Sequence, residues 1–289
     1  MADIVVEFDA VPARKSRVRR RQYSGYFWVG GAIVGLLIAV SLFAPWMTRV
    51  SPNAMDVVAN LLPIGSPGHP LGTDNYGRDM LTRLMYGGRT TLLAGIFSSL
   101  ISTLVGVALG MLAGYSGRKT DVVIMRALDV LMSFPFILMA ILIVAIAGPS
   151  TLHALLAIAV ANVPFFARII RGEVIKLKAS EYITVAKTFG AGHFSILTRH
   201  MLPNILPYVL STLFMNVGWM ISQTSSLSFL GFGTQPPTAD WGSMLAEAQS
   251  YMAIQPAIGI LPGLMICIAV VGFNLFGIGL KTALTPEGK

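Results

Sequence analysis

Long apolar runs alternate with short polar segments along most of this chain. A membrane-spanning helix needs about 20 mostly apolar residues. Runs of suitable length lie at roughly 27 to 47, 90 to 114, 122 to 147, 150 to 168, 205 to 231 and 256 to 280. The pattern therefore predicts an all-α membrane protein with six transmembrane helices. An even number of spans places both termini on the same side of the membrane.

Glycines and prolines inside the runs indicate how these helices pack. Gly106 and Gly110 have the small-xxx-small spacing that lets two membrane helices approach closely. Pro135 and Pro164 interrupt the third and fourth runs, and each is expected to kink its span. The stretch 48 to 70 is rich in proline and glycine, which predicts an ordered loop without long helices.

The composition agrees with a membrane protein. The 289 residues are 54% hydrophobic and 12% charged, with a mean hydropathy of +0.70, so charges are too few to cover a water-soluble globule. The net charge of +8 does not indicate nucleic-acid binding, because the cations flank apolar runs. The single cysteine, Cys267, excludes a disulfide framework and a cysteine metal site. The run 27 to 47 is too long for a signal-peptide core, so it is interpreted as an uncleaved span.

Lysine and arginine positions predict the orientation. Sixteen of them fall in the N-terminal tail, the 115 to 121 turn, the 168 to 203 loop and the C-terminal tail, and only four on the opposite face. The positive-inside rule therefore places both termini in the cytoplasm. The predicted organisation is a tail at 1 to 24, a membrane domain at 25 to 281 and a tail at 282 to 289. The basic first tail is expected to be a partly disordered, lipid-facing anchor, with a regulatory role as the alternative.

No catalytic motif is present. The sequence lacks the Gly-x-x-x-x-Gly-Lys-Ser/Thr phosphate loop, His-Glu-x-x-His, Gly-x-Ser-x-Gly and paired intramembrane carboxylates. The chain is therefore not expected to be an enzyme by itself or to hold a metal. Any ATP has to be bound by another subunit.

The polar loop at about 171 to 203 is the most informative segment. Residues 173 to 187 are helical in character, and Ser180 is a candidate cap within them. Tyr182, Val185, Ala186 and Phe189 would share one side, and Gly190 and Gly192 would end the helix. From these residues alone, the segment is either an interfacial helix on lipid or a helix that docks in a partner's groove.

This loop resembles the cytoplasmic coupling loop of ABC importer permeases. That family's loop carries Glu-Ala-Ala, three residues, Gly, nine residues, Ile, one residue and Leu-Pro. The chain matches it at Ala186, Gly190, Leu202 and Pro203 and departs from it at Thr184, Val185 and His200. The resemblance implies that the coupling residues are Glu181, Thr184, Val185, Ala186, Gly190, Leu202 and Pro203.

Two further stretches, 69 to 89 and 227 to 245, resemble the peptide and nickel branch of these permeases. The chain looks like the second, C-type, permease of a dipeptide or oligopeptide importer. The resemblance implies the type I importer architecture in the bacterial inner membrane. It also implies three kinds of partner: a second permease, two ATPase subunits that bind ATP and Mg, and an external substrate-binding protein.

The external stretches supply seven candidate residues for contact with the binding protein or for an outer gate: Thr73, Asp74, Arg78, Asp79, Gln235, Asp240 and Trp241. The alternative for the polar residues is a structural corner at the membrane edge. Trp241 also suits an interfacial anchor. After Asn274, the chain lacks two acidic positions that are usual in the family.

Arg126 and Asp129 lie inside the third run at i, i+3 spacing, so they are expected to form an intramembrane ion pair. The favoured function is half of a peptide translocation path that is powered by separate ATPases. Import of nickel or another small solute is the first alternative. An ion-coupled secondary transporter is the second, but the predicted spans carry few ionisable groups.

Overall fold

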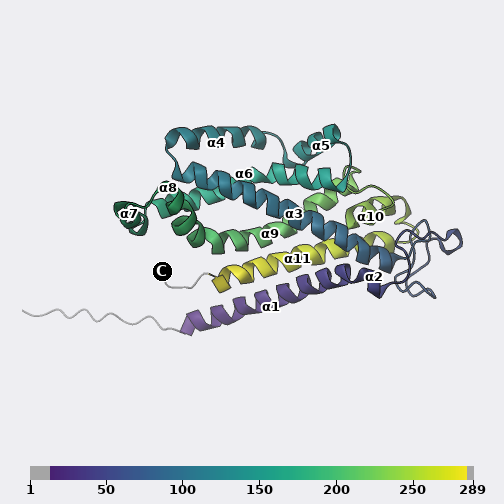
Figure 1. Cartoon of the computed structure of the whole chain (residues 1–289). Helices are drawn as coiled ribbons and strands as arrows, with labels where there is room; N and C mark the ends of the chain where they lie inside the picture. Colours follow the sequence, from purple (N-terminus) through teal and green to yellow (C-terminus); the bar gives the residue numbers. More distant parts are fainter. Residues whose placement is uncertain (1–13, 285–289) are drawn as a thin grey trace, which may run out of the picture.

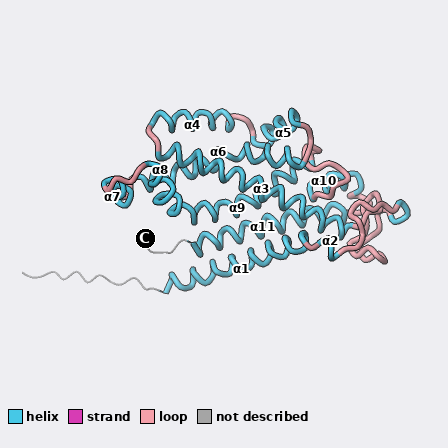
Figure 2. The backbone as a smooth tube through the Cα atoms, viewed as in Figure 1, coloured by secondary structure: helices cyan, strands magenta, loops and turns pink. Residues whose placement is uncertain are grey.

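Helices form all the regular elements within the described part of the chain (Figures 1 and 2). The computed structural model describes the backbone of residues 14–284 and the side chains of residues 25–284. The longer helices are α1 (Arg14–Leu42), α3 (Met80–Tyr115), α4 (Arg118–Met132), α5 (Phe136–Ala147), α6 (Thr151–Lys178), α9 (Leu202–Phe229) and α11 (Ala257–Leu284). The short elements are α2 (Ala44–Met47), η1 (Val57–Ala59), α7 (Glu181–Thr188), α8 (His193–Ser195), η2 (Ile196–Met201), α10 (Trp241–Ala248) and η3 (Gln249–Tyr251).

Within the described residues, five helices are long and apolar enough to cross a membrane, and α4 with α5 forms a sixth, bent candidate. The predicted all-α membrane fold is thus confirmed. Several helices extend past their apolar runs, α3 and α6 among them. α3 begins at Met80, where the Asp79 side chain caps it by accepting a hydrogen bond from the Thr82 amide at 2.8 Å. α6 continues through Pro164 as far as Lys178.

The long helices pack side by side, with α3 and α9 in the middle (Figure 1). α6 packs against α3, whereas α11 packs against α9 and α1. Glycines allow the α3–α6 contact: a Cβ on Gly110 would lie 2.6 Å from the Ala167 carbonyl oxygen, and a Cβ on Gly106 would overlap Phe166. The predicted close packing through this pair of glycines is confirmed.

The predicted third span is not one kinked helix. α4 and α5 meet at an angle of 85°. Ser133 ends α4, and its hydroxyl donates to the Val130 carbonyl oxygen at 2.7 Å. Pro135 precedes α5 and supplies no amide hydrogen, so the helical hydrogen bonds stop there. The 12 residues of α5 span only about 18 Å at 1.5 Å per residue, which is less than a membrane's apolar core.

The two ends of the bundle differ. The described chain ends lie at the same end as α7 and α8, as an even number of crossings predicts (Figure 1). We call this the α7 end. The opposite α10 end holds α2, α10 and the loop before α3, in which η1 is the only helical turn between residues 48 and 79. The predicted loop without long helices is confirmed. The predicted tails fall partly outside the described residues, because α1 begins at Arg14 and α11 ends at Leu284.

Candidate functional site

α7 is a short helix that projects from the bundle and is anchored by one buried side chain. It begins after Ser180, with Glu181 in its first turn and Lys187 in its last, which suits the helix dipole. Ile183 is fully buried and packs in one apolar cluster with Ile196 and Met201. The helix is therefore held by its inner face and leaves its outer face free.

The outer face of α7 is apolar and accessible. Tyr182 and Val185 are about half exposed, and Phe189 is 87% exposed. With Ala186 and Gly190 they line a shallow groove of about 390 Å³. His200 borders the same groove, and its Nδ1 lies 2.7 Å from the Tyr182 hydroxyl. This position departs from the family's loop pattern, and here it ties α7 to η2.

Gly190 ends this segment in a conformation that favours glycine. Its φ is +82°, and its amide donates to the Lys187 carbonyl oxygen at 2.9 Å. Leu202 and Pro203 open α9 after η2, and Leu202 packs on the Ile183 cluster. The structure thus places the predicted coupling residues in two adjoining groups, one on α7 and its turn and one at the start of α9.

Hydrogen bonds connect this loop to the spanning helices. Lys178, at the end of α6, donates to the Tyr115 carbonyl oxygen at 2.6 Å. The Tyr115 hydroxyl at the end of α3 lies 2.8 Å from Nδ1 of His193 in α8. The loop is therefore joined to α6 and α9 through the chain and to α3 through these hydrogen bonds.

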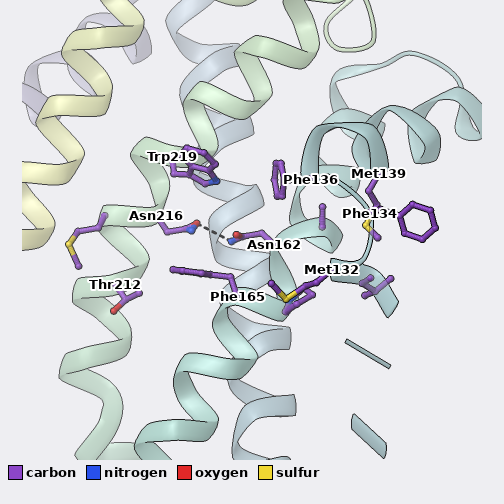
Figure 3. A pocket seen from close by; sticks show the side chains of 13 residues that line it. Met132, Phe134, Phe136, Met139, Asn162, Phe165, Thr212, Asn216 and Trp219 are labelled. Atoms are coloured by element: carbon purple, nitrogen blue, oxygen red, sulfur yellow. Dashed lines mark hydrogen bonds between the residues drawn. The ribbon is translucent and has the colours of Figure 1, made fainter. Parts of the chain in front are cut away.

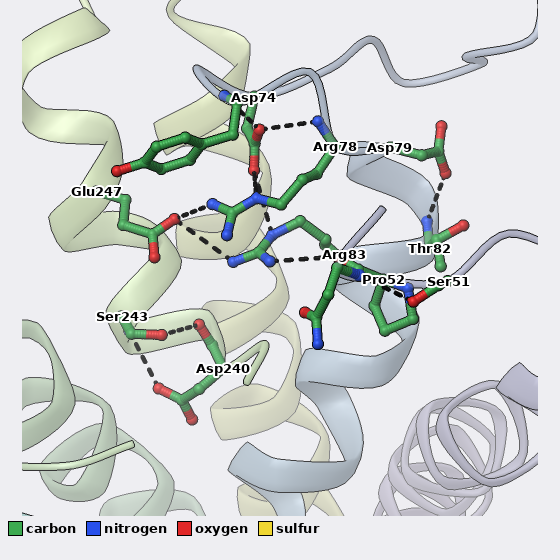
Figure 4. Close-up of polar contacts among 12 residues, drawn as sticks. Ser51, Pro52, Asp74, Arg78, Asp79, Thr82, Arg83, Asp240, Ser243 and Glu247 are labelled. Atoms are coloured by element: carbon green, nitrogen blue, oxygen red, sulfur yellow. Dashed lines mark hydrogen bonds and ion pairs between the residues drawn. The ribbon is translucent and has the colours of Figure 1, made fainter. Parts of the chain in front are cut away.

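At the α10 end, two buried arginines and two carboxylates form an ion cluster (Figure 4). The Arg78 Nε lies 2.6 Å from the Asp74 Oδ2, and its guanidinium also contacts Glu247 of α10. Arg83 of α3 reaches the same two carboxylates at 3.3 and 3.4 Å. Arg78 and Arg83 are at most 2% exposed, so the cluster joins the loop before α3, α3 itself and α10 from within.

Thr73 and Asp79 complete a structural corner beside this cluster. The Thr73 hydroxyl oxygen accepts from the Leu62 amide at 2.8 Å, and Asp79 both caps α3 and pairs with His69 at 3.0 Å. Thr73, Asp74, Arg78 and Asp79 are all buried. Their burial favours the structural corner over direct contact with another protein.

Asp240 and Trp241 form a second buried junction. Asp240 caps α10 by accepting from the Gly242 and Ser243 amides, and it also accepts from the Thr91 hydroxyl at 2.8 Å. Burial raises the pKa of this carboxyl, although these hydrogen bonds act in the opposite direction.

The interfacial-anchor prediction for Trp241 is wrong. The side chain is fully buried, and its indole donates to the Leu84 carbonyl oxygen at 2.8 Å. Gly87 and Gly88 leave room for the ring, because a Cβ on either would come within 3.1 Å of it. Gln235 is the one exposed member of the predicted external set.

The predicted pairing of Arg126 with Asp129 is also wrong. Asp129 pairs with Arg168 of α6 at 2.5 Å, and Arg126 is exposed. A second α4 carboxylate, Asp121, receives two hydrogen bonds from Arg171, one of them at 2.6 Å. The spacing within α4 allowed the local pair, but the neighbouring helix α6 supplies the cations.

A large cavity lies between the break after α4 and helices α6 and α9 (Figure 3). Its volume is about 700 Å³, within the usual size of a ligand site. Aromatic and sulfur side chains dominate its wall, and none of its lining residues is charged: Leu131, Met132, Phe134, Phe136, Met139, Ala161, Asn162, Pro164, Phe165, Thr212, Met215, Asn216 and Trp219.

Two amides stand out in this apolar wall. Asn162 of α6 donates to the Asn216 Oδ1 of α9 at 3.0 Å and to the Ser102 hydroxyl of α3 at 3.1 Å. The sequence reasoning missed them. One asparagine within each of the fourth and fifth apolar runs was the available signal, but only the fold brings the two runs together.

The sequence of this chain also matches a known protein family. Residues 106–287 match the family described as the binding-protein-dependent transport system inner membrane component. The curated relatives include a glutathione transport system permease protein GsiD from Pectobacterium atrosepticum, which is 42% identical over 90% of this chain and 86% of its own length. A dipeptide transport system permease protein DppC from Alkalihalophilus pseudofirmus is 41% identical over 89% and 86%.

A third relative, the probable D,D-dipeptide transport system permease protein DdpC of Escherichia coli K12, is 37% identical over 88% of this chain and 85% of its own length. Among solved structures, a chain of the MetNI methionine ABC transporter in an inward-facing conformation superposes with a TM-score of 0.62. It is 17% identical and covers 72% of this chain and 98% of that chain, which supports the fold. This protein is therefore a multi-pass inner-membrane permease and belongs to the family of binding-protein-dependent transport system inner membrane components.

Proposed function

We propose that this chain forms half of the translocation path of a peptide importer and that separate ATPase subunits drive it through α7. The observation that carries the proposal is the accessible apolar face of α7 on a loop fastened to α3, α6 and α9. The names of relatives that transport glutathione, dipeptides and D,D-dipeptides support peptides as the substrate class.

The α7 face suits a docking contact. Phe189 and Val185 would otherwise hold apolar surface in water at the polar end of the bundle. A short helix in a partner's groove buries such a face, while Ile183 keeps the helix joined to the permease. The partner ATPases would bind ATP and Mg, because this chain has no phosphate-binding loop.

The excess of lysine and arginine near the α7 end supports a cytoplasmic location for that end. The α10 end would then face a substrate-binding protein. Since its polar cluster is buried, that contact would use exposed residues such as Gln235 and Tyr76, with the ion cluster supporting them from below. A second, homologous permease would complete the path.

Other substrates and energy sources have less support. His69 has its Nδ1 3.0 Å from the Asp79 carboxylate, and a single histidine in this setting does not indicate a nickel site. A secondary transporter needs ionisable groups along its path. The cavity between α4, α6 and α9 has none in its lining.

The proposal predicts specific companions. A tagged chain, purified from its native membrane in mild detergent, should bring down a second permease and ATPases with phosphate-loop motifs in near-stoichiometric amounts. Mass spectrometry of the purified material identifies them. A Phe189→Asp variant is expected to lose the ATPases and keep the second permease. Recovery of the wild-type chain without any ATPase would contradict the proposal.

A further inference from the structure

The paired amides in the cavity between α4, α6 and α9 have one amide nitrogen and one amide oxygen without a partner in the described part of the chain. Asn162 and Asn216 are 5% and 6% exposed and both line the cavity. Among the described residues, the Asn162 Oδ1 and the Asn216 Nδ2 form no hydrogen bond, and neither atom is fully enclosed by protein. Both atoms are therefore available to form hydrogen bonds with a molecule in the cavity.

This pattern does not depend on how the two side chains are turned. If oxygen and nitrogen were exchanged in both amides, Asn162 would accept from Asn216, and one donor and one acceptor would again remain free. The Ser102 hydroxyl donates to the Ser99 carbonyl oxygen at 3.0 Å and accepts from the Asn162 Nδ2, which holds the Asn162 side chain against α3. Three helices therefore hold the pair in place.

We propose that this amide pair binds the backbone of a peptide in transit through one N–H and one C=O group. In an extended chain, the N–H and C=O of the same residue point to the same side, as they do in an antiparallel β-ladder. One residue of the peptide thus presents the donor and acceptor that the pair lacks. This inference rests on the proposed function, because it assumes that peptides reach the cavity.

The rest of the wall fits contact with varied side chains. Phe136, Phe165 and Trp219 surround the amide pair (Figure 3). Met132 and Met215 add flexible, polarisable surface that adapts to different shapes. Because the lining carries no charge, the site distinguishes peptides by their backbone and not by their charged ends.

The test compares two peptides in the complete importer, reconstituted with its binding protein in liposomes that contain ATP. The probes are radiolabelled tri-alanine and the same peptide with methylated backbone nitrogens, which cannot donate. Both are supplied at concentrations that saturate the binding protein. We measure the ratio of their uptake rates in the wild type and in the Asn162→Ala/Asn216→Ala variant. The binding protein is the same in both measurements, so dividing the wild-type ratio by the variant ratio removes any preference of the binding protein for one of the peptides.

The wild type is expected to favour tri-alanine over the methylated peptide more strongly than the double variant does, by roughly three- to tenfold, the loss expected for one or two hydrogen bonds. Asn274→Ala is the matched control, because this α11 amide bonds to its own helix at the Val270 carbonyl oxygen. Its ratio should equal that of the wild type. The single variants Asn162→Ala and Asn216→Ala give the same comparison if the double variant does not assemble.

An unchanged ratio in the double and single variants, with uptake intact, would overturn the amide-pair proposal and leave the importer function standing. The absence of ATP-dependent uptake of both peptides in the wild-type complex would overturn the proposed function, and the amide-pair proposal with it.

Discussion

A single residue determines the local backbone geometry at positions where other residue types do not fit. The break after α7 was predictable because Gly190 adopts a positive φ that other residues rarely accept. The pairing of Asp129 was not, because its partner Arg168 is 39 positions away, on another helix. Trp241 was misassigned for the same reason: its role follows from the space left by Gly87 and Gly88, which the sequence does not reveal.

Gly190→Trp tests the coupling assignment at the scale of one residue. No atom lies within 4 Å of a Cβ placed there, so the variant should insert and fold. The indole would occupy the groove beside Phe189 and Val185 and obstruct the partner, and the positive φ would strain the turn. We expect transport-coupled ATP hydrolysis by the reconstituted complex to fall at least tenfold.

Gly117→Trp is the matched control, since Gly117 caps α4 and its Cβ position is equally open. Its φ of −71° suits any residue, so the turn is not strained. This control should hydrolyse ATP at close to the wild-type rate. Normal peptide uptake by the Gly190→Trp complex would rule out α7 as the coupling element.

Whole elements were predicted with uneven success. The fifth and sixth apolar runs became α9 and α11 almost as expected, because length and hydropathy decide a span. The third run is divided into α4 and α5, because Pro135 removes a helical hydrogen bond at the break. The two helices meet at 85°, an angle that the sequence does not give. Helices α3 and α6 extend past their apolar runs, because polar residues can continue a helix beyond its apolar part. α3 has a capped N-terminal extension, and α6 has a polar C-terminal extension.

The α3–α6 contact gives a prediction at this scale. A leucine at Gly110 would drive its side chain into the backbone of α6, because even a Cβ would lie 2.6 Å from the Ala167 carbonyl oxygen. Such overpacking costs about 1–3 kcal/mol. Thermal unfolding of the purified Gly110→Leu variant should begin several degrees below that of the wild type.

The control for this substitution is Gly35→Leu on α1, where no atom lies within 4 Å of the added Cβ. Its unfolding temperature should stay within about a degree or two of the wild type, as expected for a substitution that meets no packed neighbour. Equal unfolding temperatures for the two variants would show that the glycines do not set the α3–α6 distance.

At the scale of the whole molecule, α3, α6 and α9 connect three features that lie far apart in the sequence. The α7 loop is fastened to all three, the ion cluster at the α10 end includes Arg83 of α3, and the amide pair joins α6 to α9 midway. The sequence predicted the loop because its residues are contiguous. It did not predict the amide pair or the full ion cluster, since both need contacts between distant segments.

The most direct test of this arrangement is the energy source of peptide uptake. Liposomes that contain the chain with its co-purified partners, the binding protein and internal ATP should accumulate radiolabelled tri-alanine, and a non-hydrolysable ATP analogue should abolish the accumulation. The chain alone, under a proton or sodium gradient, should accumulate none. ATP-independent accumulation by the chain alone would contradict the account and identify a secondary transporter.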